Sequence, residues 1–165
     1  MWDTIEKDVL NDLALIRKQT NLKKIYITGI SLGGGLSTIS YIDVKNSNIF
    51  DDVQVINWGS PRVANKNYAE FFDAATKNSS LRFIVKGDPI TVLPECLTPI
   101  CNYKHTGRQY VCIEAEEVCR GNLPVPEGVF AKLSWRIHAD PSQKNLNSLI
   151  DHITGYKKIY DFTLV

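Results

Sequence analysis

The chain has 165 residues, 22% of them charged, and a formal net charge of +1. This length suits one domain with a sizeable core, and so small a net charge gives no electrostatic reason to expect nucleic acid or an anionic membrane surface as a partner. No apolar run is long enough to span a bilayer, and the N-terminus lacks the basic-then-apolar pattern of a signal peptide.

The chain begins with an amphipathic pattern, because apolar residues recur every three or four positions from Trp2 to Ile16. This spacing predicts a helix, with Asp3 and Glu6 as a capping box at its start. In an α/β fold such a helix normally connects two parallel strands, yet no strand precedes this one. We therefore expect residues 1–165 to form a single domain that is incomplete at its N-terminus.

Residues 23–36, KKIYITGISLGGGL, combine an apolar strand, a sharp turn and a glycine-rich helix start. Residues 25–28 predict a buried parallel strand, and Leu36, Ile39 and Ile42 follow at helical spacing. Between them, residues 29–33 match G-x-S-x-G, the nucleophile elbow. Gly29 and Gly33 are expected to remove Cβ atoms that would collide with the neighbouring strand and helix.

Ser31 lies at this turn, where its hydroxyl is expected to face solvent. The start of the helix also directs free backbone N–H groups, such as that of Leu32, at an anion formed on a substrate. The pattern predicts a nucleophile with half of an oxyanion hole. A glycine-rich turn in an unrelated α/β fold is the alternative. A phosphate loop is disfavoured, because Gly35 and Thr38 replace the Lys and Gly that the two common phosphate motifs need.

Strands and helices alternate beyond the elbow. We expect strands over residues 53–58 and 81–85 and a helix over residues 68–76 between them, which together indicate an α/β fold with a parallel sheet. A ligand site is then expected beyond the carboxyl ends of the strands. A strand over residues 109–115 is predicted to pair with residues 102–105 as a hairpin, and a last helix is predicted from about residue 143 to 160.

A serine nucleophile needs a histidine base and an acid that orients it. His152 is favoured as the base, because it borders the apolar face of the last helix and completes the chain order Ser, Asp, His expected of α/β-hydrolases. His138, on a predicted loop, is the second candidate. His105 is assigned a surface or supporting role.

Asp88 is favoured as the acid, because it alone follows an apolar strand directly. Its alternative is a simple Asp-Pro turn residue. Asp51 and Asp52 precede a strand and are interpreted as loop or cap residues, and Asp73 is placed on a helix surface.

The four cysteines lie close together and allow three disulfide connectivities. A zinc site is disfavoured, because their spacing lacks paired C-x₂-C knuckles and no histidine is suitably interleaved. Local disulfides are expected, and with the Asn78-Ser79-Ser80 sequon they favour a secretory origin. The candidate disulfide residues are Cys96, Cys101, Cys112 and Cys119.

Five sequence blocks resemble, in order and spacing, those of the class 3 (fungal-type) lipases. The resemblance covers most of the chain, from about residue 2 to 160, and implies an α/β-hydrolase fold with a mostly parallel sheet and helices on both faces. It also implies hydrolysis of carboxylic esters, often acylglycerols, with Ser31 as nucleophile, Asp88 as acid and His152 as base. His105 and Gly107 match a scaffold block without a catalytic role. The blocks are GISLGGGLS, NWGSPRVANKNYAEFF, RFIVKGDPITVLP, YKHTGRQYV and IDHITGY.

The chain departs from the family pattern in two ways. Ile30 stands where the family usually has histidine, a change expected to alter packing behind the elbow. The strands that in the family bear the second oxyanion-hole donor and the lid are absent from the chain, so the strand at residues 23–30 is expected to be an exposed sheet edge.

We therefore expect a serine ester hydrolase of lipase type, acting through an acyl-enzyme on an ester or lipid substrate. It needs no metal or organic cofactor, and contact with a lipid interface is compatible with it. A phospholipase or feruloyl esterase stays open, as does a catalytically incompetent remnant that binds lipid or a partner. Secretion is favoured if a missing N-terminal segment carries a signal peptide.

Overall fold

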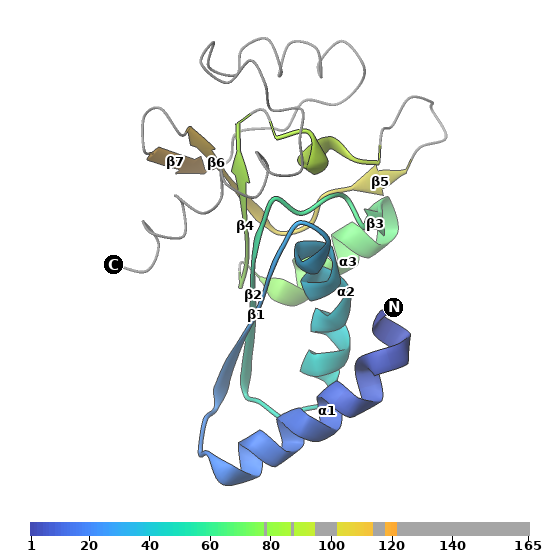
Figure 1. Cartoon of the computed structure of the whole chain (residues 1–165), viewed down its shortest axis with the longest axis vertical. Coiled ribbons are helices and arrows are strands. Elements are labelled where there is room, and N and C mark those ends of the chain that lie inside the picture. The colour runs from blue at the N-terminus through green and yellow to red at the C-terminus, as the bar shows by residue number, and fades with distance from the viewer. Residues whose placement is uncertain (78, 87, 95–101, 114–117, 122–165) are drawn as a thin grey trace.

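The structure is a computed structural model that describes residues 1–77, 79–86, 88–94, 102–113 and 118–121. Its main sheet has five strands in the order β1-β2-β4-β6-β7 (Figure 1). The first four run parallel, and β7 is antiparallel to β6. The strands are β1 (Lys24–Ile30), β2 (Asp52–Trp58), β4 (Ser80–Val85), β6 (Arg108–Ile113) and β7 (Val118–Gly121).

Three α-helices lie on the same side of this sheet in Figure 1: α1 (Trp2–Gln19), α2 (Leu32–Asn46) and α3 (Lys66–Thr76). A short 3₁₀ helix, η1 (Ile90–Val92), follows β4. The predicted α/β fold with a mostly parallel sheet is confirmed, and the helices in the described part of the chain cover one face. β1 is an edge strand of the described sheet, as expected.

The predicted capping box at the start of α1 is wrong. The helix begins two residues earlier than such a box requires, with Met1 as N-cap and no side-chain capping bond. Asp3 therefore lies inside the first turn, where its carboxylate complements the helix dipole. The Thr4 hydroxyl donates to the Met1 carbonyl at 2.6 Å.

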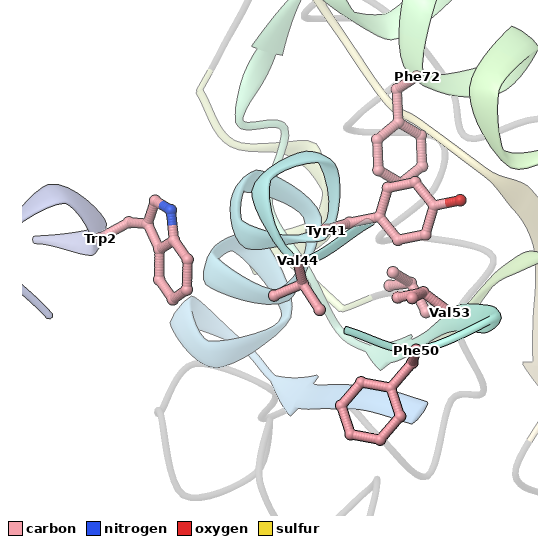
Figure 2. Close-up of a cluster of buried hydrophobic side chains, with 7 residues drawn as sticks. Trp2, Tyr41, Val44, Phe50, Val53 and Phe72 are labelled. Carbon is pink, nitrogen blue, oxygen red and sulfur yellow. The ribbon is translucent and has the colours of Figure 1, made fainter. Parts of the chain in front are cut away.

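The main hydrophobic core fills the space between the helices and the sheet. In Figure 2 the rings of Tyr41 and Phe72 lie together beside Val53, and their centroids are 5.2 Å apart. This packing joins the helices α2 and α3 to strand β2 of the sheet. The buried members are Trp2, Tyr41, Val44, Phe50, Val53, Val55 and Phe72.

The aliphatic residues of helix α2 face the core only in part, because Leu36 and Ile42 are half-buried against it. Ile39 is 37% exposed, while small residues such as Ser37 and Thr38 are buried against the sheet. The reason is the close approach of the helix to the strands, because a Cβ atom on Gly34 would lie 3.3 Å from the Asn57 Cβ atom of β2. Only small side chains fit this contact near the elbow.

The predicted hairpin between residues 102–105 and 109–115 is also wrong. β5 (Tyr103–Lys104) pairs with β3 (Ala64–Asn65) in a separate two-stranded sheet, whereas β6 pairs with β4. The segment between β5 and β6 is bonded to α3, because the Gly107 N–H donates to Asp73 Oδ1 at 2.7 Å, and Gly107 adopts φ +75°. Asp73 is exposed on α3, as predicted.

Several predictions fall outside the described residues, namely the last helix with His152, the loop with His138, and Cys96 and Cys101. In the part of the chain that the structure covers, no helix combines the length and apolarity needed to cross a membrane. The same residues contain no cluster of three or more histidine, cysteine, aspartate or glutamate side chains arranged for a metal ion.

Candidate functional site

Ser31 occupies the junction between the end of β1 and the start of α2, as the elbow motif predicts. Its backbone has φ 55° and ψ −122°, a region that residues other than glycine rarely occupy. Two hydrogen bonds hold it there: the Ser31 N–H donates to the Trp58 carbonyl at 2.9 Å, and the Gly35 N–H donates to the Ser31 carbonyl at 3.2 Å. The Ser31 hydroxyl makes no capping bond to the helix.

The glycines around Ser31 serve different purposes. A Cβ atom on Gly29 would lie 2.2 Å from the carbonyl atoms of Gly33, so the expected role of Gly29 is confirmed. The same expectation for Gly33 is wrong, because a Cβ atom there would meet nothing within 4 Å. The close approaches occur one turn further along, where a Cβ atom on Gly35 would lie 2.7 Å from Val63 Cγ1.

Leu32 is the first residue of α2, and its side chain is 59% exposed. The first four N–H groups of an α-helix lack partners within the helix, so the Leu32 N–H is available to an acceptor beside Ser31. A role for the Leu32 N–H as an oxyanion-hole donor stays a prediction.

Asp88 follows the carboxyl end of β4, as predicted, and is 1% exposed. Its Oδ1 atom accepts the Ile90 N–H at 2.8 Å, and its carbonyl accepts the Thr91 hydroxyl at 2.8 Å. The carboxylate thus closes a tight turn into η1, so the turn role considered for Asp88 is present and fixes one carboxylate oxygen. Ser31 and Asp88 lie beyond the carboxyl ends of their strands, at the same end of the sheet, because β1 and β4 both run parallel to β2.

Asp52 and the pair Cys112 and Cys119, also considered from the sequence, form an ion pair and a disulfide. Asp52 is the first residue of β2 and forms an ion pair with Lys24 at 3.3 Å. Cys112 and Cys119 form a disulfide across β6 and β7, which confirms a local bridge for this pair.

Two side chains hold the turn after Asp88: Arg62, which sequence reasoning missed, and His105, to which it gave only a surface or supporting role. Arg62 is 6% exposed, and its Nη1 atom donates to the Val92 carbonyl at 2.5 Å. His105 Nε2 lies 2.6 Å from the Thr91 carbonyl. Burial, and then the charges of Arg82 and Arg62, hold the pKa of His105 well below its ordinary value. The sequence did contain a pointer to Arg62 and His105, because both residues lie in blocks that carry the family resemblance.

A family model and a curated relative both match this chain, and both are described as lipases. Residues 1–98 match the family model described as Lipase (class 3). The chain is 29% identical over 119 residues to secreted mono- and diacylglycerol lipase 2 of Gibberella zeae, an alignment that covers 67% of this chain and 29% of that protein.

Solved structures share the fold. The Rhizomucor miehei lipase in its propeptide complex superposes with a TM-score of 0.68 at 20% identity, over 92% of this chain and 46% of that chain. A triacylglycerol lipase, described as having a serine protease triad as its catalytic centre, gives a TM-score of 0.67 at 20% identity, over 92% of this chain and 54% of that one. The chain thus spans under a third of the curated relative and about half of these solved chains.

Proposed function

The chain belongs to the class 3 lipase family, and we propose that it is a serine ester hydrolase that cleaves carboxylic esters, acylglycerols in particular. The observation that carries this proposal is the backbone of Ser31, held at φ 55° between a parallel strand and a helix start. Strained non-glycine residues cluster at active sites, where the surrounding structure maintains them. The acylglycerol class is supported by the relative named as a mono- and diacylglycerol lipase.

In the proposed mechanism the Ser31 Oγ atom attacks the ester carbonyl carbon while His152 takes the hydroxyl proton. The Leu32 N–H donates to the developing oxyanion. When the tetrahedral intermediate collapses, the C–O bond to the alcohol breaks, and the alcohol leaves with the proton from His152. A water molecule then attacks the acyl carbon and gives a proton to His152. The Ser31 Oγ–acyl bond breaks, the carboxylic acid leaves, and His152 returns the proton to Ser31 Oγ.

Asp88 is the proposed partner of His152. Its burial and the hydrogen bond from the Ile90 N–H favour a carboxylate of fixed orientation beside the imidazole. Such a carboxylate holds the imidazole in the correct tautomer and stabilises the imidazolium that forms during the reaction. These groups complete the reaction without a metal or an organic cofactor. The second oxyanion-hole donor, predicted to lie outside this chain, stays a prediction.

Hydrolysis of p-nitrophenyl esters with short, medium and long acyl chains tests the proposal. We expect Ser31→Ala and His152→Ala each to remove nearly all turnover, and the double variant to cost little more, because triad members act as a unit. His138→Ala is the matched control and is expected to keep near-normal rates.

Two outcomes would overturn parts of this assignment. Unchanged turnover in Ser31→Ala would exclude Ser31 as the nucleophile and the mechanism with it. Normal rates in His152→Ala together with lost activity in His138→Ala would move the base to His138 and leave the hydrolase proposal standing. A chain that folds but hydrolyses none of the esters would favour the remnant that binds lipid without catalysis.

We also propose that the protein is secreted. The Cys112–Cys119 disulfide supports this, because disulfides persist in oxidising compartments, and the curated relative is named as a secreted lipase. Mass spectrometry of the protein from its source, without reduction, should find this pair oxidised. A free thiol at Cys112 would remove this support.

A further inference from the structure

The turn that carries Asp88 is held from outside by two side chains of distant segments. We propose that Arg62 and His105 are positioning residues, which fix the orientation of the Asp88 carboxylate by anchoring the main chain of residues 90–94. The inference rests on the proposed function, because it assigns these residues to the acid of the proposed triad. It adds two residues that neither touch the reacting atoms nor belong to the Ser31–Asp88–His152 set.

Arg62 makes three hydrogen bonds to this turn. Its Nη1 atom donates to the carbonyls of Val92 at 2.5 Å and Pro94 at 3.2 Å, and its main-chain N–H donates to the Leu93 carbonyl at 2.7 Å. A buried guanidinium is costly unless its donors are satisfied, and its planar fork matches fixed acceptors better than a flexible ammonium does. The three bonds therefore fix the end of the turn against the segment that follows β2.

His105 anchors the middle of the same turn. Its Nε2 atom lies 2.6 Å from the Thr91 carbonyl, which can only accept, so Nε2 carries the proton in this contact. The lowered pKa of His105 keeps the imidazole neutral, with its single N–H directed at Thr91. This bond joins the segment after β5 to η1.

Both anchors reach Asp88 through the turn itself. The Thr91 hydroxyl donates to the Asp88 carbonyl, and the Ile90 N–H donates to Asp88 Oδ1, each at 2.8 Å. The residues that Arg62 and His105 hold are thus adjacent to those that orient the carboxylate. Catalytic groups must be held within a fraction of an ångström, so loosening these anchors should misalign Asp88 without removing it.

Amide hydrogen exchange at Ile90 tests the anchoring without any need for activity. We expect Arg62→Lys and His105→Leu to speed Ile90 exchange about tenfold or more, relative to the global opening rate. His105→Gln is the conservative variant, because its side-chain amide can donate from the position of Nε2, and it should restore protection. Trp2→Phe is the control: it removes a part-buried hydrogen bond from α1 to Asp43 of α2 and should leave relative Ile90 exchange unchanged.

Steady-state kinetics test the catalytic part. Arg62→Lys should lower kcat about 10- to 100-fold with KM nearly unchanged, and in an Asp88→Asn background it should cost less than about twofold more. The same loss in both backgrounds, or unchanged Ile90 exchange in Arg62→Lys and His105→Leu, would overturn the proposal. Full turnover in Ser31→Ala would instead overturn the proposed function, while the exchange data would still decide whether the anchors exist.

Discussion

A Cβ atom on Gly29 would lie 2.2 Å from the carbonyl carbon and oxygen of Gly33, so β1 and α2 meet where no side chain fits. This contact sets the angle at which the helix leaves the strand. The residue between them, Ser31, is thereby forced into its unusual backbone conformation. The conformation of the elbow thus follows from the packing of β1 against α2.

Gly29→Ala should destabilise the fold strongly, because relief of the clash must move the backbone of either β1 or α2. We expect a loss of about 2 to 4 kcal/mol in the free energy of unfolding, measured by urea denaturation. Gly33→Ala is the matched control. Its methyl group enters open space inside a helix and should stabilise the chain by up to about 1 kcal/mol. Equal effects of the two substitutions would contradict the packing argument.

The strain at Ser31 predicts a conflict between stability and activity. Ser31→Gly should be more stable than Ser31→Ala by about 1 kcal/mol, because glycine tolerates φ 55° and alanine does not, although glycine also loses more entropy on folding. Both variants lack the hydroxyl and should lack turnover. Identical urea midpoints for the two variants would show that the surrounding structure bears no strain at this position.

The strands and the elbow could be predicted because their signals are local. β1, β2 and β4 are apolar runs bounded by turn residues, and G-x-S-x-G fixes a strand–turn–helix order within five positions. β3 was missed because a two-residue strand carries no periodicity, and β5 was therefore given the wrong partner. The small residues that α2 buries near the elbow were missed, because apolar spacing does not reveal the close approach of Gly34 to β2.

In the candidate site, too, residues marked by local sequence could be predicted, and residues defined by distant contacts could not. Positions at strand ends identified Ser31 and Asp88 from local sequence alone. The role proposed for Arg62 and His105 could not be found by that reasoning, because it depends on hydrogen bonds to carbonyls 14 to 32 residues away in sequence. The role of His152 and the incompleteness of the domain stay predictions.

The lowered pKa of His105 predicts acid sensitivity. Below about pH 6.5 the unfolded chain binds a proton at this imidazole and the folded chain does not, so the free energy of unfolding falls as pH decreases. The limiting slope is about 1.4 kcal/mol per pH unit, down to the lowered pKa of the folded state. Above about pH 6.5 His105 contributes no pH dependence.

Urea midpoints between about pH 5 and 7 measure this effect. His105→Gln cannot titrate, so its stability should fall less steeply over that window than that of the unmodified chain. Parallel pH curves for the two proteins would show that His105 has an ordinary pKa.

The Cys112–Cys119 disulfide should stabilise the end of the sheet where β7 pairs with β6. The two residues are direct partners in the antiparallel register and are separated by seven positions in sequence. A loop of this size predicts a loss of about 2 to 3 kcal/mol on removal of the bond. Urea denaturation of the double variant Cys112→Ala, Cys119→Ala should show that loss, and reductant should then have no further effect at this pair. An unchanged midpoint would mean that β7 does not contribute to the cooperative unit.

Covalent labelling of the folded chain with a p-nitrophenyl phosphonate tests most directly whether Ser31 is the nucleophile. A serine nucleophile attacks this reagent at phosphorus and releases p-nitrophenolate. We expect a single adduct in the intact mass, located by peptide sequencing at Ser31, with loss of ester hydrolysis in parallel. Ser31→Ala should remain unlabelled under the same conditions. An adduct at another residue, or ester hydrolysis that continues at full rate in Ser31→Ala, would contradict the claim that this elbow serine is the nucleophile.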